Sequence, residues 1–152
     1  MRTWELFLKE HRIMHDGKRE DSREDEDNTY ESFFEETSSG QHVPRTIFID
    51  TDRTTIDEIK QFSKGLFHPE QLMSYKQDCK NNFFEGRSMA TQYEIGKNVM
   101  ERLGRQCDNC SNLQGFFVFN SCGGGTGSGI GMEVVHMMRD EFGKKVIYQP
   151  LI

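Results

Sequence analysis

Apolar residues recur along the chain at two spacings, one typical of helices and one of short buried strands. The first apolar stripe predicts an amphipathic helix over residues 3–14. Further helices and strands are predicted in this order: a strand at 46–49, a helix with Thr54 or Thr55 as its N-cap that closes at Gly65, a short extended segment after the proline turn at 67–72, a helix at 90–107, a strand at 113–119, a helix at 130–142 and a strand at 146–148. Strands that alternate with helices indicate an α/β fold with a mostly parallel sheet.

Two polar stretches interrupt this pattern. Residues 18–36 are strongly acidic, with only Lys18, Arg19 and Arg23 as cations. A block of like charges cannot bury enough apolar surface to offset the entropy of ordering it. We therefore expect a mobile acidic loop at about 18–36 rather than a metal site. A second polar loop is expected at residues 78–82.

Composition excludes several classes of protein. The 152 residues suit one domain, and 34% of them are hydrophobic. No apolar run is long enough to cross a bilayer, and the first residues lack the apolar core of a signal peptide. The net charge of −6 argues against nucleic-acid binding. We expect neither a membrane nor a nucleic acid as partner, and we expect the four cysteines to be reduced thiols.

A glycine-rich segment, Gly-Gly-Gly-Thr-Gly-Ser-Gly at residues 123–129 and here called the glycine loop, lies between a buried-strand pattern and a helical one. Glycine allows the backbone to approach an anion closely, and the following helix start offers unpaired N–H groups. We interpret the loop as a phosphate-binding segment, with the Ser121 and Thr126 hydroxyls as additional donors. A flexible linker is the alternative, which the position between a strand and an amphipathic helix disfavours. Neither the Walker spacing nor the Gly-x-Gly-x-x-Gly spacing fits this sequence.

The glycine loop resembles the phosphate-loop signature of the tubulin family. Other segments agree with alpha-tubulin in order and spacing: Trp4-Glu5-Leu6, His42-Val43-Pro44-Arg45, Ile56-Asp57-Glu58, Phe67-His68-Pro69-Glu70-Gln71-Leu72, Asn81-Asn82, Leu113-Gln114-Gly115-Phe116 and Phe142-Gly143-Lys144-Lys145. The segments at 56–58 and 67–72 favour the alpha over the beta subunit. The similarity covers nearly the whole chain except the acidic block.

This resemblance implies a fold and a set of site residues. The fold is a partial Rossmann-like, doubly wound α/β sheet with flanking helices, forming one partial GTP-binding domain over residues 1–152. The implied cofactors are GTP and Mg²⁺. The implied nucleotide-binding residues are Asp50, Asp78, Asn81, Ser121, Gly123, Gly124, Gly125, Thr126 and Gly127, and the implied metal ligand is Asp52. For Asp50 and Asp78, a role in capping turns is the alternative on sequence alone.

The resemblance also implies partners and a location. Family members assemble head-to-tail, so a beta-tubulin-like subunit is the expected partner, with tubulin chaperones as further partners, in the cytoplasm and its cytoskeleton. The family's first strand would precede this sequence, and its guanine-reading and catalytic loops would follow the strand near Tyr148. We therefore expect no catalytic residue in this chain.

Several positions depart from the family pattern. Asp52 stands where alpha-tubulins carry the longer glutamate, so contact with a metal through water is an alternative to direct contact. Lys80 introduces a cation near the phosphate loops, which either assists binding or points to solvent. The connection at residues 86–92 is longer than the family's. Cys107 and Cys110 form a lone Cys-x-x-Cys motif without a second pair, for which a structural role is expected rather than zinc or redox chemistry.

Two other functions remain as alternatives. In the first alternative, the chain is a non-nucleotide interaction module or truncated relic of an alpha-tubulin, which binds tubulin partners or chaperones through its surfaces. In the second, it is an unrelated nucleotide or sugar-phosphate enzyme that uses the same kind of glycine loop. Tighter binding of guanine than of adenine nucleotides would argue against the second alternative.

Overall fold

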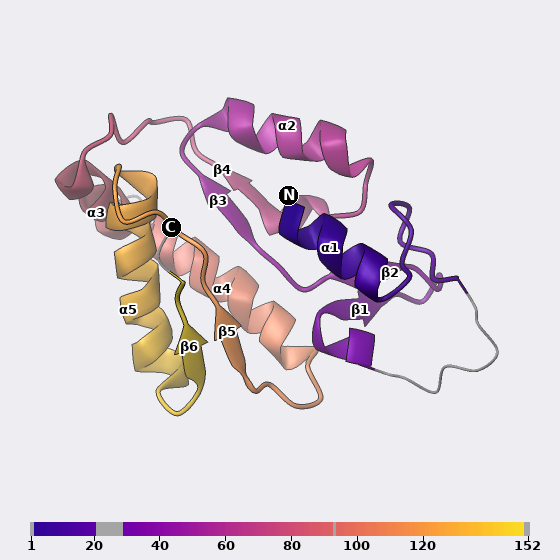
Figure 1. Ribbon diagram of the computed structural model, residues 1–152. Helices are drawn as coiled ribbons and strands as arrows, with labels where there is room; N and C mark the ends of the chain where they lie inside the picture. Colours follow the sequence, from indigo (N-terminus) through magenta and orange to yellow (C-terminus); the bar gives the residue numbers. More distant parts are fainter. Residues whose placement is uncertain (1, 21–28, 93, 151–152) are drawn as a thin grey trace. The chain divides into compact units, whose positions relative to one another are not determined.

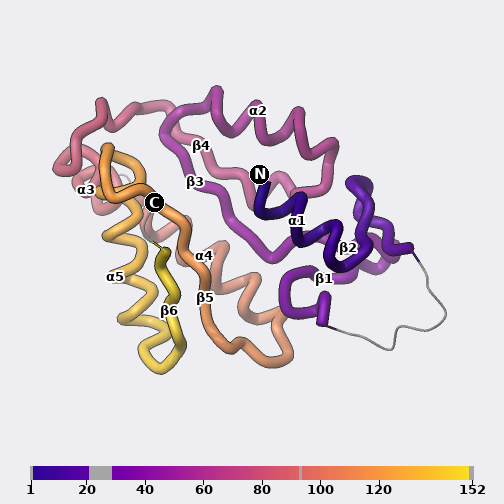
Figure 2. Tube along the Cα trace, in the orientation of Figure 1, coloured from indigo at the N-terminus to yellow at the C-terminus, as the bar shows by residue number. Residues whose placement is uncertain are grey.

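The computed structural model describes residues 2–20, 29–92 and 94–150. The chain forms two compact units, Met1–Ser74 and Tyr75–Ile152, whose paths are shown in Figures 1 and 2. Each unit contains its own two-stranded parallel sheet. We describe each unit by itself.

Among its described residues, the Met1–Ser74 unit combines a parallel and an antiparallel strand pair with two α-helices. Its elements are α1 (Arg2–Glu10), the 3-10 turn η1 (Thr29–Ser32), β1 (Phe34–Glu36), β2 (His42–Pro44), β3 (Phe48–Asp50), α2 (Arg53–Ser63), the 3-10 turn η2 (Pro69–Gln71) and β4 (Leu72–Ser74). β1 and β2 are antiparallel, whereas β3 and β4 are parallel with Phe48 opposite Leu72. Helix α2 runs alongside β3 and β4 (Figure 1).

The core of this unit is built from residues that lie far apart in the sequence. Its buried members are Leu8, Ile13, Phe34, Ile56, Leu66, Phe67 and Leu72. The Trp4 ring packs edge-on against Phe34, with ring centroids 5.7 Å apart, and against Phe67 at 6.3 Å. Edge-to-face aromatic pairs add to the burial energy, so these rings tie α1 to the rest of the unit.

The prediction of a loop over residues 18–36 is wrong at both ends. Residues 21–28 lie outside the described part of the chain. Before them, Arg19 forms a β-bridge with Ile13. After them, η1 and β1 follow, and Phe34 is fully buried. Two phenylalanines at the end of the acidic block supply the apolar surface that the charge pattern alone does not reveal.

The predicted element ends also shift in this unit. Helix α1 ends at Glu10, because Arg12 adopts the left-handed conformation with φ of 55°. The strand predicted at 46–49 is β3, two residues later at its start. The N-cap of α2 is Asp52 rather than Thr54 or Thr55, and its carboxylate accepts a hydrogen bond from the Thr54 N–H at 2.8 Å. The predicted end near Gly65 is confirmed within two residues by the left-handed C-cap Lys64.

The Tyr75–Ile152 unit contains three α-helices and a parallel strand pair among its described residues. Its elements are α3 (Phe83–Gln92), α4 (Ile95–Asp108), β5 (Gly115–Phe117), the π-helical turn η3 (Thr126–Ile130), α5 (Gly131–Phe142) and β6 (Val146–Tyr148). The predicted single helix at 90–107 is wrong at its start. Two helices occur instead, separated at Glu94, whose φ is 55°.

The sheet of this unit has one covered and one exposed face. Phe116 of β5 packs on Phe142 of α5, with ring centroids 5.0 Å apart. Its neighbours on the other face, Phe117, Val146 and Tyr148, are 62%, 68% and 58% exposed. The alternation follows from the two-residue period of a strand. The predicted strands at 113–119 and 146–148 are thus present, the first shorter than expected.

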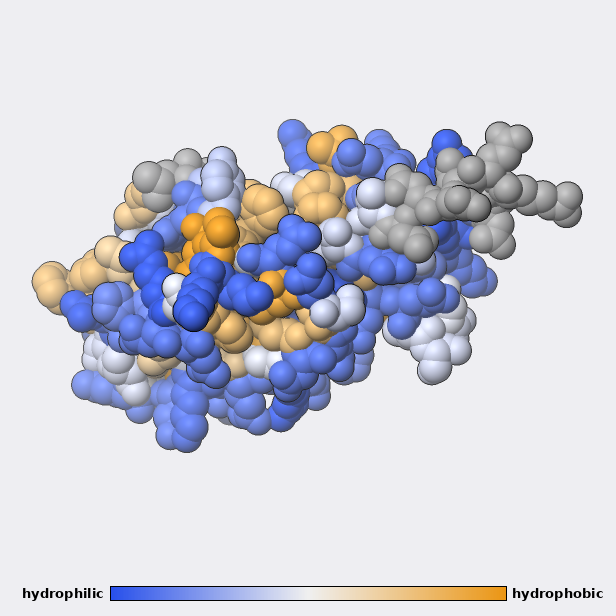
Figure 3. Space-filling model, turned by 90° about the horizontal axis from the view of Figure 1, so that it is seen from below, coloured by the Kyte–Doolittle hydropathy of each residue, from blue (hydrophilic) through white to orange (hydrophobic). Residues whose placement is uncertain are grey.

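These elements confirm the α/β class, with parallel strand pairs joined by helices. Among the described helices, none combines the length and the apolar character that a membrane span requires. On the face shown in Figure 3, hydrophilic and hydrophobic residues are intermixed. The mean hydropathy of the chain is −0.75.

Candidate functional site

The glycine loop connects β5 to η3 and α5 within the second unit. Gly124 adopts φ of +79°, which side-chain-bearing residues rarely tolerate. Thr126 begins η3, and Gly125 precedes it without a side-chain cap. The chain therefore turns from a strand into a helix over a run of glycines, which carry no side chains of their own beside the first N–H groups.

The carbonyl groups of Gly123, Gly124, Gly125 and Gly127 are bonded within the protein. The Ser121 hydroxyl donates to the Gly123 carbonyl at 2.6 Å, and the Ser128 hydroxyl donates to that of Gly124. The Gly125 carbonyl accepts from the N–H groups of residues 129 and 130, at 2.9 and 3.3 Å. The Asn120 amide donates to the Gly127 carbonyl at 2.9 Å. These bonds hold the negative ends of the peptide dipoles in place.

Four backbone N–H groups of the same loop have no hydrogen-bond acceptor among the described residues. They are the N–H groups of Gly123, Gly124, Gly125 and Gly127. Successive unpaired N–H groups at the start of a helix form an anion-binding arrangement. The donors present thus fit a phosphate group.

A second loop, residues 78–82, packs closely against the glycine loop. A Cβ atom at Gly125 would overlap the Cβ of Cys79 and lie 2.9 Å from the Asn82 carbonyl oxygen. A Cβ atom at Gly124 would lie 3.1 Å from Oδ1 of Asn81. Cys79 is 1% exposed and holds this loop in the core of the unit. The structure therefore brings Asn81 next to the glycine loop, whereas Asp78 is exposed on the same segment.

Helix α3 also packs closely against the glycine loop. A Cβ atom at Gly86 would overlap the Gly125 carbonyl, and one at Gly129 would lie 2.5 Å from the Phe83 carbonyl oxygen. Glycine at both positions lets α3 and η3 pack backbone against backbone. The Arg87 guanidinium then lies 3.4 Å from the Glu133 carboxylate on α5.

The two hydroxyls expected as phosphate donors have partners inside the unit. Ser121 donates to the Gly123 carbonyl, so it shapes the loop, and its oxygen retains acceptor capacity. The Thr126 hydroxyl lies 4.0 Å from the Cys79 sulfur, a weak contact that is readily exchanged for a stronger acceptor.

The predicted acidic residues Asp50 and Asp52 belong to the first unit. Oδ1 of Asp50 accepts from the Asp52 N–H at 3.0 Å, and Asp52 caps α2. The turn-capping role given as the alternative for Asp50 is therefore present in the structure. In each carboxylate the other oxygen has no hydrogen-bond partner among the described residues. Carboxylate oxygens are the ligands that Mg²⁺ prefers, so both side chains retain a suitable donor.

Within the described ranges, no group of three or more His, Cys, Asp or Glu side chains is arranged to hold a metal ion. Mg²⁺ is commonly bound through only one or two carboxylates, with water and phosphate oxygens as its other ligands, so the donors of this unit fit the metal.

Sequence reasoning missed three residues that support the loop. The Cys79 side chain packs against Gly125, and the lack of a side chain at Gly86 leaves room for the Gly125 carbonyl. Asn120 bridges the glycine loop to the end of β6, because its Oδ1 accepts from the Gln149 side chain at 2.8 Å. None of the three carried a sequence signal, because a glycine is informative only inside a recognised helix and the apolar residues of α3 around Gly86 form no single stripe.

The Cys107–Cys110 motif lies at the end of α4, and the four cysteines form no disulfide in the described structure. Burial raises the pKa of the Cys107 thiol to about 11, and Cys110, Asp108 and Glu141 act in the same direction. A raised pKa keeps the thiol protonated at neutral pH and unreactive.

Comparison with known proteins shows the family of this chain. The sequence model of the Tubulin/FtsZ family, GTPase domain, matches residues 1–152. The chain belongs to this family. Its α/β architecture is accordingly a partial Rossmann-like domain, as the resemblance implied.

Individual relatives agree with the family match. The chain is 47% identical to a tubulin alpha chain of Colletotrichum orbiculare over 94% of its length, and 46% identical to the tubulin alpha-2 chain of Emericella nidulans over the same share. It is 46% identical to the tubulin alpha-1 chain of Arabidopsis thaliana over 93%. It spans 32% of the length of each of these relatives. The likeness to alpha-tubulins inferred from the sequence is thereby confirmed.

Proposed function

We propose that this chain is a tubulin-like GTP-binding protein whose glycine loop holds the nucleotide phosphates. The observation that supports this most directly is the set of unpaired N–H groups at Gly123, Gly124, Gly125 and Gly127. The carbonyls beside them are bonded inward, so a phosphate meets donors rather than acceptors. Asn81, on the adjoining loop, places its side-chain oxygen Oδ1 next to Gly124, and the NH₂ group of the same amide would be the donor to a phosphate.

We assign Mg²⁺ to the acidic residues of the first unit. Asp52 would be the metal ligand and Asp50 its neighbour in the nucleotide site, while Asp78 would serve near the phosphates. Bound Mg²⁺ neutralises phosphate charge and orients the nucleotide. The residues of this chain bind and orient, and none is assigned to the hydrolysis of GTP.

We further propose a role in the microtubule cytoskeleton. The likeness to alpha-tubulins supports a beta-tubulin-like subunit as the head-to-tail partner. Tubulin chaperones as additional partners and the cytoplasm as location are part of the same proposal. Nucleotide would then serve assembly rather than turnover.

Replacing Thr126 with alanine is expected to weaken GTP binding about tenfold. The contact of this hydroxyl with the Cys79 sulfur is weak, whereas a hydrogen bond to a charged phosphate is worth about 1.5–3 kcal/mol. Equilibrium binding of GTP in low-salt buffer with Mg²⁺ measures the change. Thr91→Ala is the matched control, because the Thr91 hydroxyl bonds to the Arg87 and Ser88 carbonyls of its own helix. Undetectable binding by the unmodified chain would contradict the proposed function.

A second candidate function is a protein-interaction module without nucleotide. The exposed Phe117, Val146 and Tyr148 on the β5–β6 sheet favour it, because exposed aromatic patches mark interaction surfaces. Co-sedimentation with microtubules separates the two candidates. Co-sedimentation of nucleotide-free chain supports the interaction module, whereas co-sedimentation that requires GTP supports the GTP-binding function.

A further inference from the structure

The loop at residues 78–82 carries an unusual backbone. Lys80 and Asn81 both adopt left-handed conformations, with φ of 49° and 56°. The turn is closed by the Asn82 N–H, which donates to the Cys79 carbonyl at 2.9 Å. Consecutive left-handed residues that are not glycine store strain, and such strain is concentrated at functional sites. The conformation fixes where the Lys80 side chain leaves the backbone.

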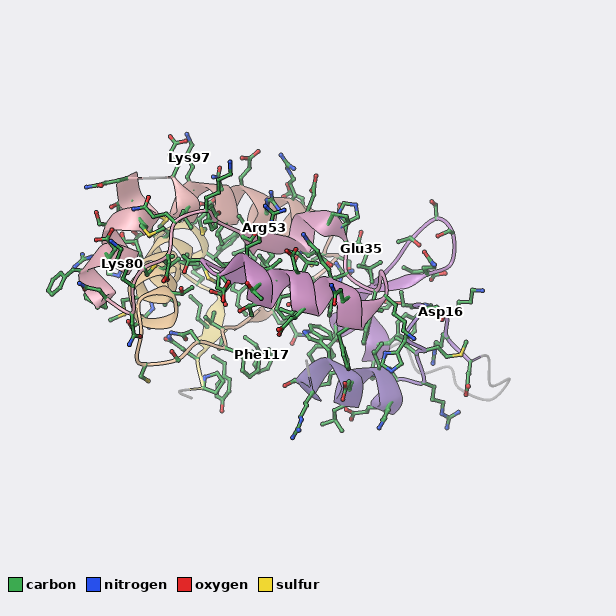
Figure 4. All side chains as sticks on the ribbon, turned by 90° about the horizontal axis from the view of Figure 1, so that it is seen from above. Asp16, Glu35, Arg53, Lys80, Lys97 and Phe117 are labelled. Carbon is green, nitrogen blue, oxygen red and sulfur yellow. The ribbon has the colours of Figure 1, made fainter. Side chains whose placement is uncertain are left out.

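The neighbours of Lys80 attach this turn to the glycine loop. Cys79, before it, is buried against Gly125, and Asn81, after it, lies against Gly124. Lys80 itself is exposed. It is therefore held on the segment that borders the unpaired N–H groups, with a flexible four-carbon stem free to reach a ligand there. Figure 4 labels Lys80 on the connection that precedes α3.

The charges around the glycine loop single out Lys80. Residues 113–130 contain neither cation nor anion. Arg87, on the adjoining helix, is already paired with Glu133. Lys80 forms no ion pair with any residue in the described ranges, and neither does Asp78 on the same turn. A lysine in this position supplies phosphate with a point charge and three donors.

We infer that Lys80 is a phosphate-binding residue, whose ammonium group contacts the phosphates of the nucleotide at the glycine loop. This inference rests on the proposed nucleotide binding. Because Lys80 and Mg²⁺ both neutralise phosphate charge, the lysine contributes most when the metal is absent. The affinity of the unmodified chain for GTP should therefore depend less on Mg²⁺ than the affinity of a variant without Lys80.

The test compares four proteins: the unmodified chain, Lys80→Ala, Lys80→Arg and Lys76→Ala. Lys76 is the matched control, since it is an exposed lysine on the same connection but lies outside the strained turn. Dissociation constants for GTP and GDP are measured with Mg²⁺ and with EDTA over a range of salt concentrations. Thermal unfolding followed by circular dichroism shows whether each variant is folded.

Lys80→Ala is expected to bind GTP about tenfold more weakly with EDTA, less so with Mg²⁺, and with a shallower dependence on salt. Lys80→Arg retains the affinity, and Lys76→Ala matches the unmodified chain. Equal affinity and salt dependence for folded Lys80→Ala and the unmodified chain would overturn the inference while leaving GTP binding intact. Failure of the unmodified chain itself to bind GTP would instead overturn the proposed function, and this inference with it.

Discussion

Replacing Gly125 with alanine is expected to destabilise the Tyr75–Ile152 unit by about 3 kcal/mol and to abolish GTP binding. The added Cβ overlaps the Cβ of buried Cys79 and lies 2.9 Å from the Asn82 carbonyl oxygen. Relief requires the glycine loop and the loop at residues 78–82 to move apart, which displaces the N–H groups from their arrangement. Urea unfolding measures the first effect, and equilibrium binding of GTP measures the second.

The matched control is Gly104→Ala. Gly104 lies inside α4, and a Cβ atom there meets nothing within 4 Å. The same chemical change should therefore stabilise the helix by about 0.5–1 kcal/mol and leave GTP binding unchanged. A Gly125→Ala variant that keeps both its stability and its GTP affinity would show that the close approach of the two loops is not required.

The second large effect is expected in the other unit. Phe34→Ala should lower the free energy of unfolding of the Met1–Ser74 unit by about 3–5 kcal/mol, because Phe34 is fully buried and truncation leaves a cavity. Trp4 is the single tryptophan of the chain and its ring packs against Phe34. Tryptophan fluorescence during urea unfolding therefore reports on this unit directly.

Phe62→Ala provides the comparison for this experiment. Phe62 lies on α2 and is 54% exposed. The same truncation there should lower the free energy of unfolding by less than about 1 kcal/mol. Equal effects of the two variants would contradict the placement of Phe34 in the core, and with it the conclusion that the end of the acidic block belongs to the folded unit.

The glycine loop and its flanking strand and helix were predictable because their signal is local. A strand pattern, a run of glycines and a helical stripe follow one another directly in the sequence, and β5, η3 and α5 appear in that order. The left-handed Gly124 illustrates why glycine is needed there. What the local pattern does not contain is the partner of the loop. The contacts of Cys79 and Asn82 with Gly125 join residues more than forty positions apart.

Helix α3 was missed for a different physical reason. Its apolar residues do not form one stripe, because Phe84 is 76% exposed while Met89 and Ala90 are buried. A helix that packs through a glycine face, at Gly86, has little apolar periodicity to detect. The break at Glu94 carries no proline or glycine, so its left-handed conformation was also not predictable.

Charge patterning misled the prediction for residues 18–36. The acidic composition outweighed the pair Phe33 and Phe34, although the first packs on Phe7 and the second lies in the core. In the same unit, Asp52 was predicted as a metal ligand and is seen as the N-cap of α2. One carboxylate can fill both roles, since the cap uses only one of its oxygens.

NMR of the ¹⁵N-labelled chain during titration with Mg²⁺–GTP tests whether the glycine loop binds the phosphates. We expect the amide resonances of Gly123, Gly124, Gly125 and Gly127 to shift and to saturate at one GTP per chain, because these N–H groups gain phosphate acceptors. The amide of Gly104, inside α4, should not move. Unchanged resonances for the four loop glycines at saturating Mg²⁺–GTP would contradict the assignment of this loop to phosphate binding.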